Sequence, residues 1–188
     1  MVGRKGALLH RGPGDVRYRD RWFCYLDLLG FALLVNSDKV HEVIPTYEDV
    51  IQELKSHADA ETSRGVMFSW FSDTFIVYSR YGTERDFAAV ESVGCLFFQR
   101  LLLADIPVRG ALTYGKLYSR GRKNIFVGPA LIDAYSYGEK QNWLGFLLTP
   151  NASERLRGTR LDLRDRAHYR SVDQPEVLRG LPHEGAYA

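Results

Sequence analysis

The sequence contains little of the material that builds a disulfide scaffold, a zinc site or a membrane span. Its two cysteines, Cys24 and Cys95, lie inside apolar runs, which is typical of reduced, buried thiols. Its five histidines are scattered with no ligand spacing, so neither zinc nor a histidine-based nucleophile is indicated. No apolar run reaches the ~18 residues of a membrane span, and no leader has the signal-peptide pattern. We therefore expect a cytoplasmic protein without a membrane partner.

Neither positive nor negative charge is in large excess. The 25 basic and 23 acidic side chains leave a net charge of +2, so no global field favours nucleic acid or an anionic membrane. An anionic ligand must then be held by local groups. The glycine-rich stretches "RGPGD" and "YGKLYSRGRKN" do not match a P-loop and are interpreted as turns.

The 188 residues, 45% of them hydrophobic, are enough for one ordinary core. We expect a loose, basic and glycine-rich arm over residues 1–20 and a catalytic domain over 21–160. From 161 to 188 the chain is polar and weakly patterned, which predicts a C-terminal extension.

The apolar patterns predict a split βαβ arrangement. Strands are expected over residues 21–29, over 66–79 as a hairpin that bends at Ser72 and Asp73, over 108–119 and over 145–149. Helices are expected over 45–60 with Thr46 as N-cap, over 84–105, over 128–141, and over 151–158 with Asn151 or Ser153 as N-cap. This order predicts an α+β, ferredoxin-like fold, a mostly antiparallel sheet with flanking helices.

Two aspartates carry the chemistry of this pattern. Asp27 lies in the apolar run "FCYLDLLGFALLV", where a buried carboxylate needs a strong partner such as a metal ion. A split βαβ fold brings Asp27 and Asp73 to one edge of the sheet. A single aspartate at a strand end is usually a turn or cap residue. The pair, together with Gly30, favours two divalent cations, Mn²⁺ or Mg²⁺, in a phosphoryl-transfer site.

The segment after Asp27 is a candidate phosphate-binding turn. The backbone amides of Leu29, Gly30 and Phe31, turning into the next helix, are placed to donate to phosphate oxygens. Phe23 and Phe31 flank the strand and are candidate walls of a nucleotide pocket, although core packing also explains Phe23.

Four blocks, "YLDLLGF", "WFSDTFIV", "PVRGALTYG" and "FVGPALIDAYSYGE", resemble the class III nucleotidyl cyclase catalytic domain in order and spacing, over about residues 21 to 150. The resemblance implies a homodimer with active sites at the interface. It also implies conversion of a nucleoside triphosphate to its 3′,5′-cyclic monophosphate and pyrophosphate. By this resemblance Asp27 and Asp73 are catalytic metal ligands, and the carbonyl of Leu28 contributes to the second ion.

The sequence departs from the family at four places. Purine cyclases carry a lysine and an aspartate that read the base, and Ser69 and Ile125 stand there. The family's asparagine and arginine, which orient the ribose and stabilise the transition state, fall at about Ile132 and Ser136. Purine recognition is therefore not expected.

With these departures, the chain resembles the bacterial pyrimidine cyclases of the Pycsar antiphage system. That resemblance implies cyclic UMP or cyclic CMP as a messenger for a separate effector, and we favour UTP over CTP as substrate. A purine (adenylate or guanylate) cyclase and a catalytically inactive, nucleotide-binding cyclase homologue remain alternatives. A palm-like polymerase is less consistent, because no basic groove for a template is evident.

Several basic side chains are candidates to replace the family's cations that this sequence lacks. Lys140, after the fourth block, is the preferred triphosphate contact. The other candidates are Arg109, Lys116, Arg120, Arg122 and Lys123. Tyr135 and Tyr137 are candidates to orient the ribose or base, although tyrosines at helical spacing are more often packing residues.

Overall fold

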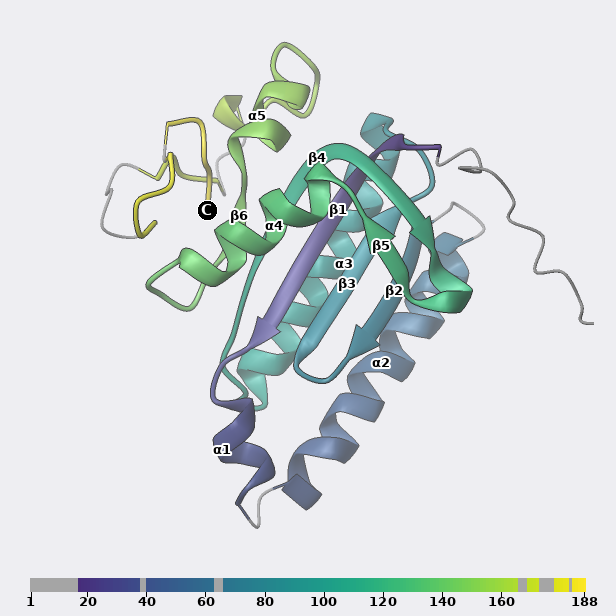
Figure 1. Cartoon of the computed structure of the whole chain (residues 1–188), viewed down its shortest axis with the longest axis vertical. Helices are drawn as coiled ribbons and strands as arrows, with labels where there is room; N and C mark the ends of the chain where they lie inside the picture. The colour runs from purple at the N-terminus through teal and green to yellow at the C-terminus, as the bar shows by residue number, and fades with distance from the viewer. Residues whose placement is uncertain (1–16, 38–39, 63–65, 166–168, 173–177, 183) are drawn as a thin grey trace, which may run out of the picture.

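The computed structural model describes residues 17–37, 40–62, 66–165, 169–172, 178–182 and 184–188 (Figure 1). Its strands are β1 (Arg19–Leu28), β2 (Val66–Phe71), β3 (Thr74–Ser79), β4 (Val108–Arg120), β5 (Ile125–Val127) and β6 (Phe146–Leu148). Its helices are α1 (Phe31–Val35), α2 (Val40–Thr62), α3 (Glu84–Leu103), α4 (Pro129–Lys140) and α5 (Pro150–Leu156), with 3-10 turns η1 (Gly121–Lys123) and η2 (Leu163–Asp165).

One sheet organises the molecule, in the order β2-β3-β1-β4-β5, with all neighbours in this path antiparallel. Strand β6 pairs parallel to β4. Helix α2 connects β1 to β2, and α3 connects β3 to β4, so β1 and β4 lie at the centre. The predicted α+β, ferredoxin-like fold is confirmed.

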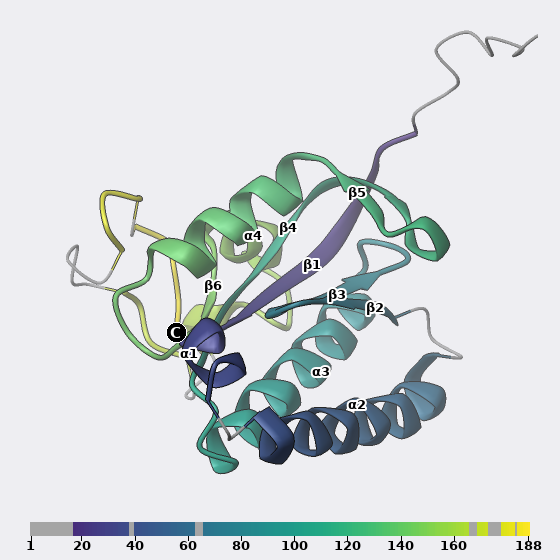
Figure 2. The ribbon, with the colours of Figure 1, turned by 60° about the horizontal axis from the view of Figure 1, so that its bottom comes forward.

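The two faces of the sheet have different cover. Figure 2 shows α2 and α3 on one side of the sheet and α4 on the other. Because side chains alternate along a strand, Trp22, Cys24 and Leu26 face the main core under α3, whereas Phe23 and Tyr25 belong to a second cluster with α4. The residue that continues this second series is Asp27, which therefore lies on the α4 face.

Aromatic stacking and a capped helix hold the main core together. Phe75 of β3 stacks on Phe97 of α3 with ring centroids 4.1 Å apart. Helix α3 begins at a capping box in which the Thr83 hydroxyl accepts from the Asp86 amide and the Asp86 carboxylate accepts from the Thr83 amide. Helix α3 connects β3 to β4, which pair with opposite edges of β1.

The hairpin formed by β2 and β3, its bend at Ser72 and Asp73, and the long helix α3 match the sequence predictions. The helix predicted over residues 45–60 is longer. It starts at Val40 and runs through Pro45, so Thr46 is not its N-cap. A proline usually marks a helix start, and here tertiary packing extends the helix past it.

Thr149 holds the N-cap position of helix α5 without a side-chain capping hydrogen bond, and Pro150 is in the first turn. The predicted caps Asn151 and Ser153 are therefore wrong, because both lie inside the helix. Strand β5 was not predicted at all; its three residues are too few to show a period.

The chain ends pack more closely on the domain than the sequence pattern indicated. Strand β1 begins at Arg19, within the predicted arm, while residues 1–16 of that arm lie outside the described residues. Val172, Leu178 and Ala186 of the predicted C-terminal extension form a third buried cluster, whose members on the domain are Ala111, Tyr137 and Leu147. In the described part of the chain, no helix combines the length and apolarity needed to cross a membrane.

Candidate active site

The two aspartates lie at the same end of the sheet. Asp27 of β1 is paired with Thr74 of β3, and Asp73 immediately precedes Thr74 in the hairpin bend. The Leu28 amide donates to the Asp73 carbonyl over 3.0 Å, which fastens the bend to the end of β1. The register of three central strands therefore brings Asp27 and Asp73 together across 45 intervening residues.

Asp27 is held by groups from two other elements. On its other side β1 pairs with β4, and Arg109 is the residue directly opposite. Arg109 donates to Asp27 Oδ2 from Nε over 3.3 Å and from Nη2 over 3.2 Å. The same guanidinium donates from Nη2 to Glu139 Oε2 and from Nη1 to the Glu139 carbonyl, both over 2.8 Å. The Arg109 guanidinium thus bonds to the carboxylates of both Asp27 and Glu139.

This environment changes the proton affinity of Asp27. Burial and the nearby Glu139 carboxylate raise the pKa of Asp27 from 3.8 to about 6, and Arg109 only partly offsets them. Burial and the neighbouring Asp27 raise the pKa of Tyr25 above its ordinary value, so its phenol stays protonated. The Tyr25 hydroxyl donates to Glu139 Oε1 over 3.2 Å and lies 3.5 Å from Asp27 Oδ1. The surroundings of Asp27 therefore disfavour its ionised form, and a cation in addition to Arg109 would stabilise that form.

The donor set suits a hard divalent cation. Carboxylate and carbonyl oxygens are the ligands that Mg²⁺ and Mn²⁺ prefer. Across the described ranges, no three acidic, histidine or cysteine side chains gather closely enough to hold a metal ion. Asp27 and Asp73 would thus be joined by the Leu28 carbonyl, water and substrate phosphate, which is the usual pattern for Mg²⁺. Asp27, Asp73 and the Leu28 carbonyl fit Mg²⁺ or Mn²⁺ once the Arg109 side chain moves away from the Asp27 carboxylate.

The turn after β1 offers fewer amides than the sequence indicated. The Leu29 amide donates to the Pro107 carbonyl over 2.8 Å, so in this structure it is engaged with the backbone. Gly30 precedes α1 with φ of 74°, a left-handed conformation that favours glycine. Gly30 and Phe31 open the helix and keep their predicted positions at the turn.

The two predicted aromatic walls both make core contacts. Phe23 is completely buried under α4, which agrees with the alternative of core packing. Phe31 is partly buried and packs against the main core.

The predicted contacts on α4 are accessible. Tyr135 is 51% exposed, with its ring 5.5 Å from that of Tyr25. Lys140 is exposed and directly follows Glu139 in the last turn. Among the alternative cations, Arg109 is the one at Asp27, whereas Lys116 pairs with Asp20 at the other end of β1.

A cavity opens beside the aspartates. It has a volume of about 460 Å³ and is lined by Ser69, Phe71, Thr74, Ile76, Asn124 and Phe126. Thr74 is the residue paired with Asp27, and Ser69 and Ile76 form the next cross-strand pair on the same face. The Ser69 hydroxyl donates to Asn124 Oδ1 over 3.0 Å. A neutral serine therefore stands where the resemblance places the base-reading lysine, and its hydrogen-bond partner Asn124 directly precedes Ile125, the position of the base-reading aspartate.

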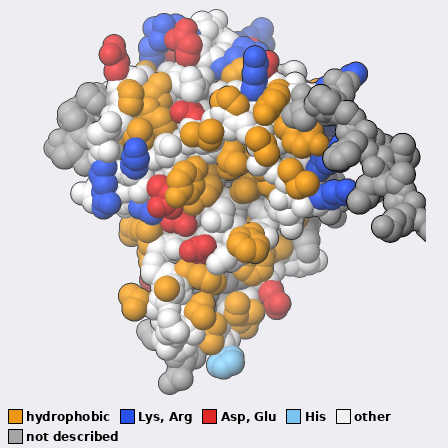
Figure 3. All heavy atoms as spheres, in the orientation of Figure 1, with side chains coloured by type: hydrophobic (Ala, Val, Ile, Leu, Met, Phe, Trp, Pro, Cys, Tyr) orange, Lys and Arg blue, Asp and Glu red, His pale blue; other side chains and the backbone are white. Residues whose placement is uncertain are grey.

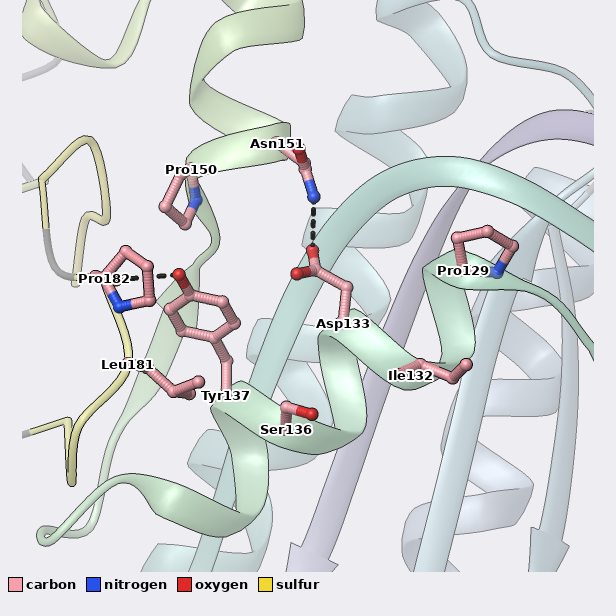
Figure 4. Close-up of a pocket in the computed structure, with 9 residues that line it drawn as sticks. All are labelled: Pro129, Ile132, Asp133, Ser136, Tyr137, Pro150, Asn151, Leu181 and Pro182. Carbon is pink, nitrogen blue, oxygen red and sulfur yellow. Dashed lines mark hydrogen bonds between the residues drawn. The ribbon is translucent and has the colours of Figure 1, made fainter.

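A second cavity, of about 540 Å³, lies on the outer side of α4 (Figure 4). Ile132 and Ser136, the positions of the family's asparagine and arginine, line it. Asp133 Oδ2 accepts from Asn151 over 2.9 Å and from Thr149 over 3.0 Å. The Asp133 carboxylate is thus fixed to the start of α5, while Ile132 is 66% exposed.

Of three comparisons with known proteins, only the one with solved structures gives matches. No model of a protein family matches the chain, and no curated protein is a significant match. Among solved structures, the adenylyl cyclase CyaB from P. aeruginosa is 12% identical, with a TM-score of 0.65 over 91% of this chain and 93% of that one.

Two fungal structures give the same result. The guanylate cyclase domain of RhGC from Catenaria anguillulae, in complex with GTP, is 12% identical, with a TM-score of 0.65 over 90% of this chain and 95% of that one. A non-canonical dimeric guanylyl cyclase domain of the RhoGC fusion protein from the aquatic fungus Blastocladiella emersonii is 11% identical, with a TM-score of 0.58 over 74% of this chain and 83% of that one. The chain therefore has the fold of nucleotidyl cyclase catalytic domains.

Two residues of the site were not found from the sequence. Glu139 reaches Asp27 and Arg109 only because α4 packs across β1 and β4, and no spacing in the sequence encodes that angle. Asn124 was noted only as the end of a basic turn. Its left-handed φ of 50° ends η1 and positions it next to Ser69. Arg109 was a candidate cation, but its contact with Asp27 was not predicted. The strand register of a split βαβ sheet would have predicted that contact.

Proposed function

We propose that the protein is a divalent-metal-dependent nucleotidyl cyclase that converts a pyrimidine nucleoside triphosphate to its 3′,5′-cyclic monophosphate and pyrophosphate. UTP is the favoured substrate over CTP. In this reaction the ribose 3′-oxygen bonds to the α-phosphorus, the bond to pyrophosphate breaks, and the hydroxyl proton passes to solvent. The cyclic product serves as a messenger for a separate effector in antiphage defence.

The observation that carries the proposal is the meeting of Asp27 and Asp73 at one end of a cyclase-like sheet. Bound at these carboxylates, two divalent ions would lower the pKa of the 3′-hydroxyl and neutralise the phosphates. Burial keeps Asp27 in a low-dielectric environment, where a cation is held more strongly than at the surface. Asp73 lies in the two-residue bend between β2 and β3.

The remaining charges of the triphosphate need donors from the chain. Arg109 is next to Asp27 and offers a planar guanidinium with several donors. The first amides of α1, at Gly30 and Phe31, and the exposed Lys140 are the further donors in this proposal. Tyr135, half exposed on α4, contributes a flat surface for the ribose or base.

Base selection is assigned to the cavity at Ser69 and Asn124. Because Ser69 donates to Asn124 Oδ1, the Asn124 Nδ2 group remains a donor and the Ser69 oxygen an acceptor. Uracil presents a matching pair, an acceptor at O4 and a donor at N3, whereas cytosine presents the reverse pair. This complementarity favours UTP over CTP.

A homodimer completes the proposal. Exposed apolar side chains flank the site on the hairpin and on α4, with Phe71 80% exposed and Ile132 66% exposed. Hydrophobic side chains gather across the middle of the same face, with acidic side chains among them (Figure 3). A second copy related by C2 symmetry would cover this surface and give two equivalent sites. The apolar cover also disfavours nucleic acid as a partner.

The test is product formation from each of the four triphosphates with Mn²⁺ or Mg²⁺, separated by chromatography. We expect UTP to give cyclic UMP, and Asp27→Ala and Asp73→Ala each to abolish it. Asp20→Ala is the matched control, because Asp20 is an exposed aspartate on the same strand β1. It should retain wild-type activity.

Each alternative has a distinct outcome in this assay. Cyclic AMP or cyclic GMP as the main product would replace the pyrimidine proposal with a purine cyclase, which the purine-cyclase neighbours also fit. Nucleotide binding without any product, unaffected by either substitution, would indicate an inactive cyclase homologue.

A further inference from the structure

Arg109 occupies the place on Asp27 that a divalent cation would take. Its Nε and Nη2 atoms lie 3.3 and 3.2 Å from Asp27 Oδ2. Asp27 and Arg109 are directly opposed in the β1–β4 register, so the backbone cannot separate them. The Arg109 side chain can move while this register is kept, if another group attracts it.

Glu139 has the geometry to attract it. Arg109 makes two bonds of 2.8 Å to Glu139, one to the carboxylate and one to the backbone carbonyl, and both are shorter than its bonds to Asp27. The carbonyl bond is anchored in the last turn of α4. The Tyr25 hydroxyl donates to the other carboxylate oxygen of Glu139 over 3.2 Å and fixes its orientation. Arg109 can therefore release Asp27 and keep both contacts with Glu139.

We propose that Glu139 is a positioning residue that draws Arg109 off Asp27, so that Asp27 becomes available to a divalent cation. The inference rests on the proposed function, in which Asp27 is a metal ligand. Cation and guanidinium compete for the same carboxylate oxygen, since two positive charges cannot share it without repulsion. Glu139 provides the second acceptor that makes the exchange possible.

A direct role for Glu139 as metal ligand is less consistent with the geometry. The Glu139 carboxylate is already occupied on both oxygens, with Arg109 Nη2 on Oε2 and the Tyr25 hydroxyl on Oε1. In the described part of the chain, no third acidic, histidine or cysteine side chain joins a metal-binding group here. Glu139 thus acts on the cation through Arg109.

The experiment measures Mn²⁺ affinity of the full-length protein by titration calorimetry, without nucleotide. Glu139→Gln removes the competing charge and should leave Arg109 on Asp27, which raises the Kd for Mn²⁺ by about tenfold, the coupling typical of residues in one ion-pair network. Arg109→Gln should lower the Kd. In the double variant the Kd should equal that of Arg109→Gln, because Glu139 has nothing left to position.

Two variants separate this role from simple attraction of the cation. Glu139→Asp keeps the charge but withdraws the carboxylate from Arg109 by one methylene, so its Kd should rise in the same direction. A weaker Kd in the double variant than in Arg109→Gln would make Glu139 a metal ligand and overturn the inference. Unchanged Kd values in Glu139→Gln and Glu139→Asp would also overturn it.

Asp27→Asn distinguishes the failure of this inference from failure of the proposed function. If Asp27→Asn leaves the Kd for Mn²⁺ at the wild-type value, Asp27 does not hold the metal and both proposals fail. If Asp27→Asn abolishes binding while the Glu139 variants bind as wild type, only the positioning role fails. Thermal denaturation of each variant confirms that it is folded before titration.

Discussion

Asp27→Asn should stabilise the free protein while abolishing its activity. The substitution removes a charge from a side chain that is only 11% exposed and adjoins a second carboxylate, Glu139. Asparagine has nearly the same shape, and its carbonyl oxygen can still accept from Arg109. Arg109 keeps its ion pair with Glu139. Active sites often contain carboxylates that lower the stability of the fold but are needed for activity.

The raised pKa sets the size of the effect. A rise from 3.8 to about 6 corresponds to an upper bound of about 3 kcal/mol, at 1.36 kcal/mol for each tenfold change in proton affinity. Solvent screening lowers this bound, and we take about 1–2 kcal/mol. For a chain of this length, that free energy raises the Tm by about 3–6 °C.

The pH dependence has a definite sign. Because the folded-state pKa of Asp27 lies above its unfolded value, its contribution to stability is fully present below about pH 4 and is lost as the pH rises through about 6. The stability advantage of Asp27→Asn should therefore be full at pH 7.5 and vanish near pH 4. Glu139, Arg109 and Tyr25 are the charged or titratable groups in contact with Asp27, and all three are retained.

The assay is thermal denaturation of metal-free protein at pH 7.5, 6 and 4.5, with Asp20→Asn as control. Asp20 is an exposed aspartate on the same strand, so its substitution should change the free energy of unfolding by less than about 0.5 kcal/mol. A variant Asp27→Asn that is no more stable than wild type at pH 7.5, or equally stabilised at all three pH values, would refute the reasoning.

Two further predictions concern the core and the base pocket. Phe97→Ala removes a ring that is 1% exposed and stacked on Phe75, so it should lower the free energy of unfolding by about 3–5 kcal/mol in urea denaturation. The control is Leu103→Ala on the same helix, which removes a side chain that is 79% exposed and should change this free energy little. Equal losses in the two variants would contradict the packing described. Ser69→Lys combined with Ile125→Asp restores the purine-reading side chains of the resemblance. It should shift the product of a mixed triphosphate assay from cyclic UMP toward purine cyclic nucleotides, and retained selection of UTP would count against the base pocket.

Local patterns in the sequence were sufficient to predict the split βαβ arrangement, in which the first strand lies beside the hairpin that carries Asp73. The apolar density of β1, the polar bend between two apolar strands and the long amphipathic α3 each specify one element, and the split βαβ rules then fix which strands are neighbours. Asp27 and Asp73 meet because strand order and register are determined by these elements.

The parts that could not be predicted depend on tertiary packing. Phe23 alternates onto the same face as Asp27, and only the position of α4 over β1 makes it core. Leu29 loses its amide to Pro107, a residue 78 positions away that no local pattern links to it. Glu139 likewise reaches the site from α4 across the sheet. A sequence indicates which residue types are present, whereas helix docking decides which of them share a pocket.

The most direct test of the account is where Mn²⁺ binds in a crystal grown with 3′-deoxy-UTP, which lacks the attacking hydroxyl and cannot be cyclised. Anomalous diffraction should place manganese in contact with carboxylate oxygens of both Asp27 and Asp73, with the triphosphate over the same end of the sheet. Manganese bound elsewhere, or bound to neither aspartate while the nucleotide is present, would contradict the central claim.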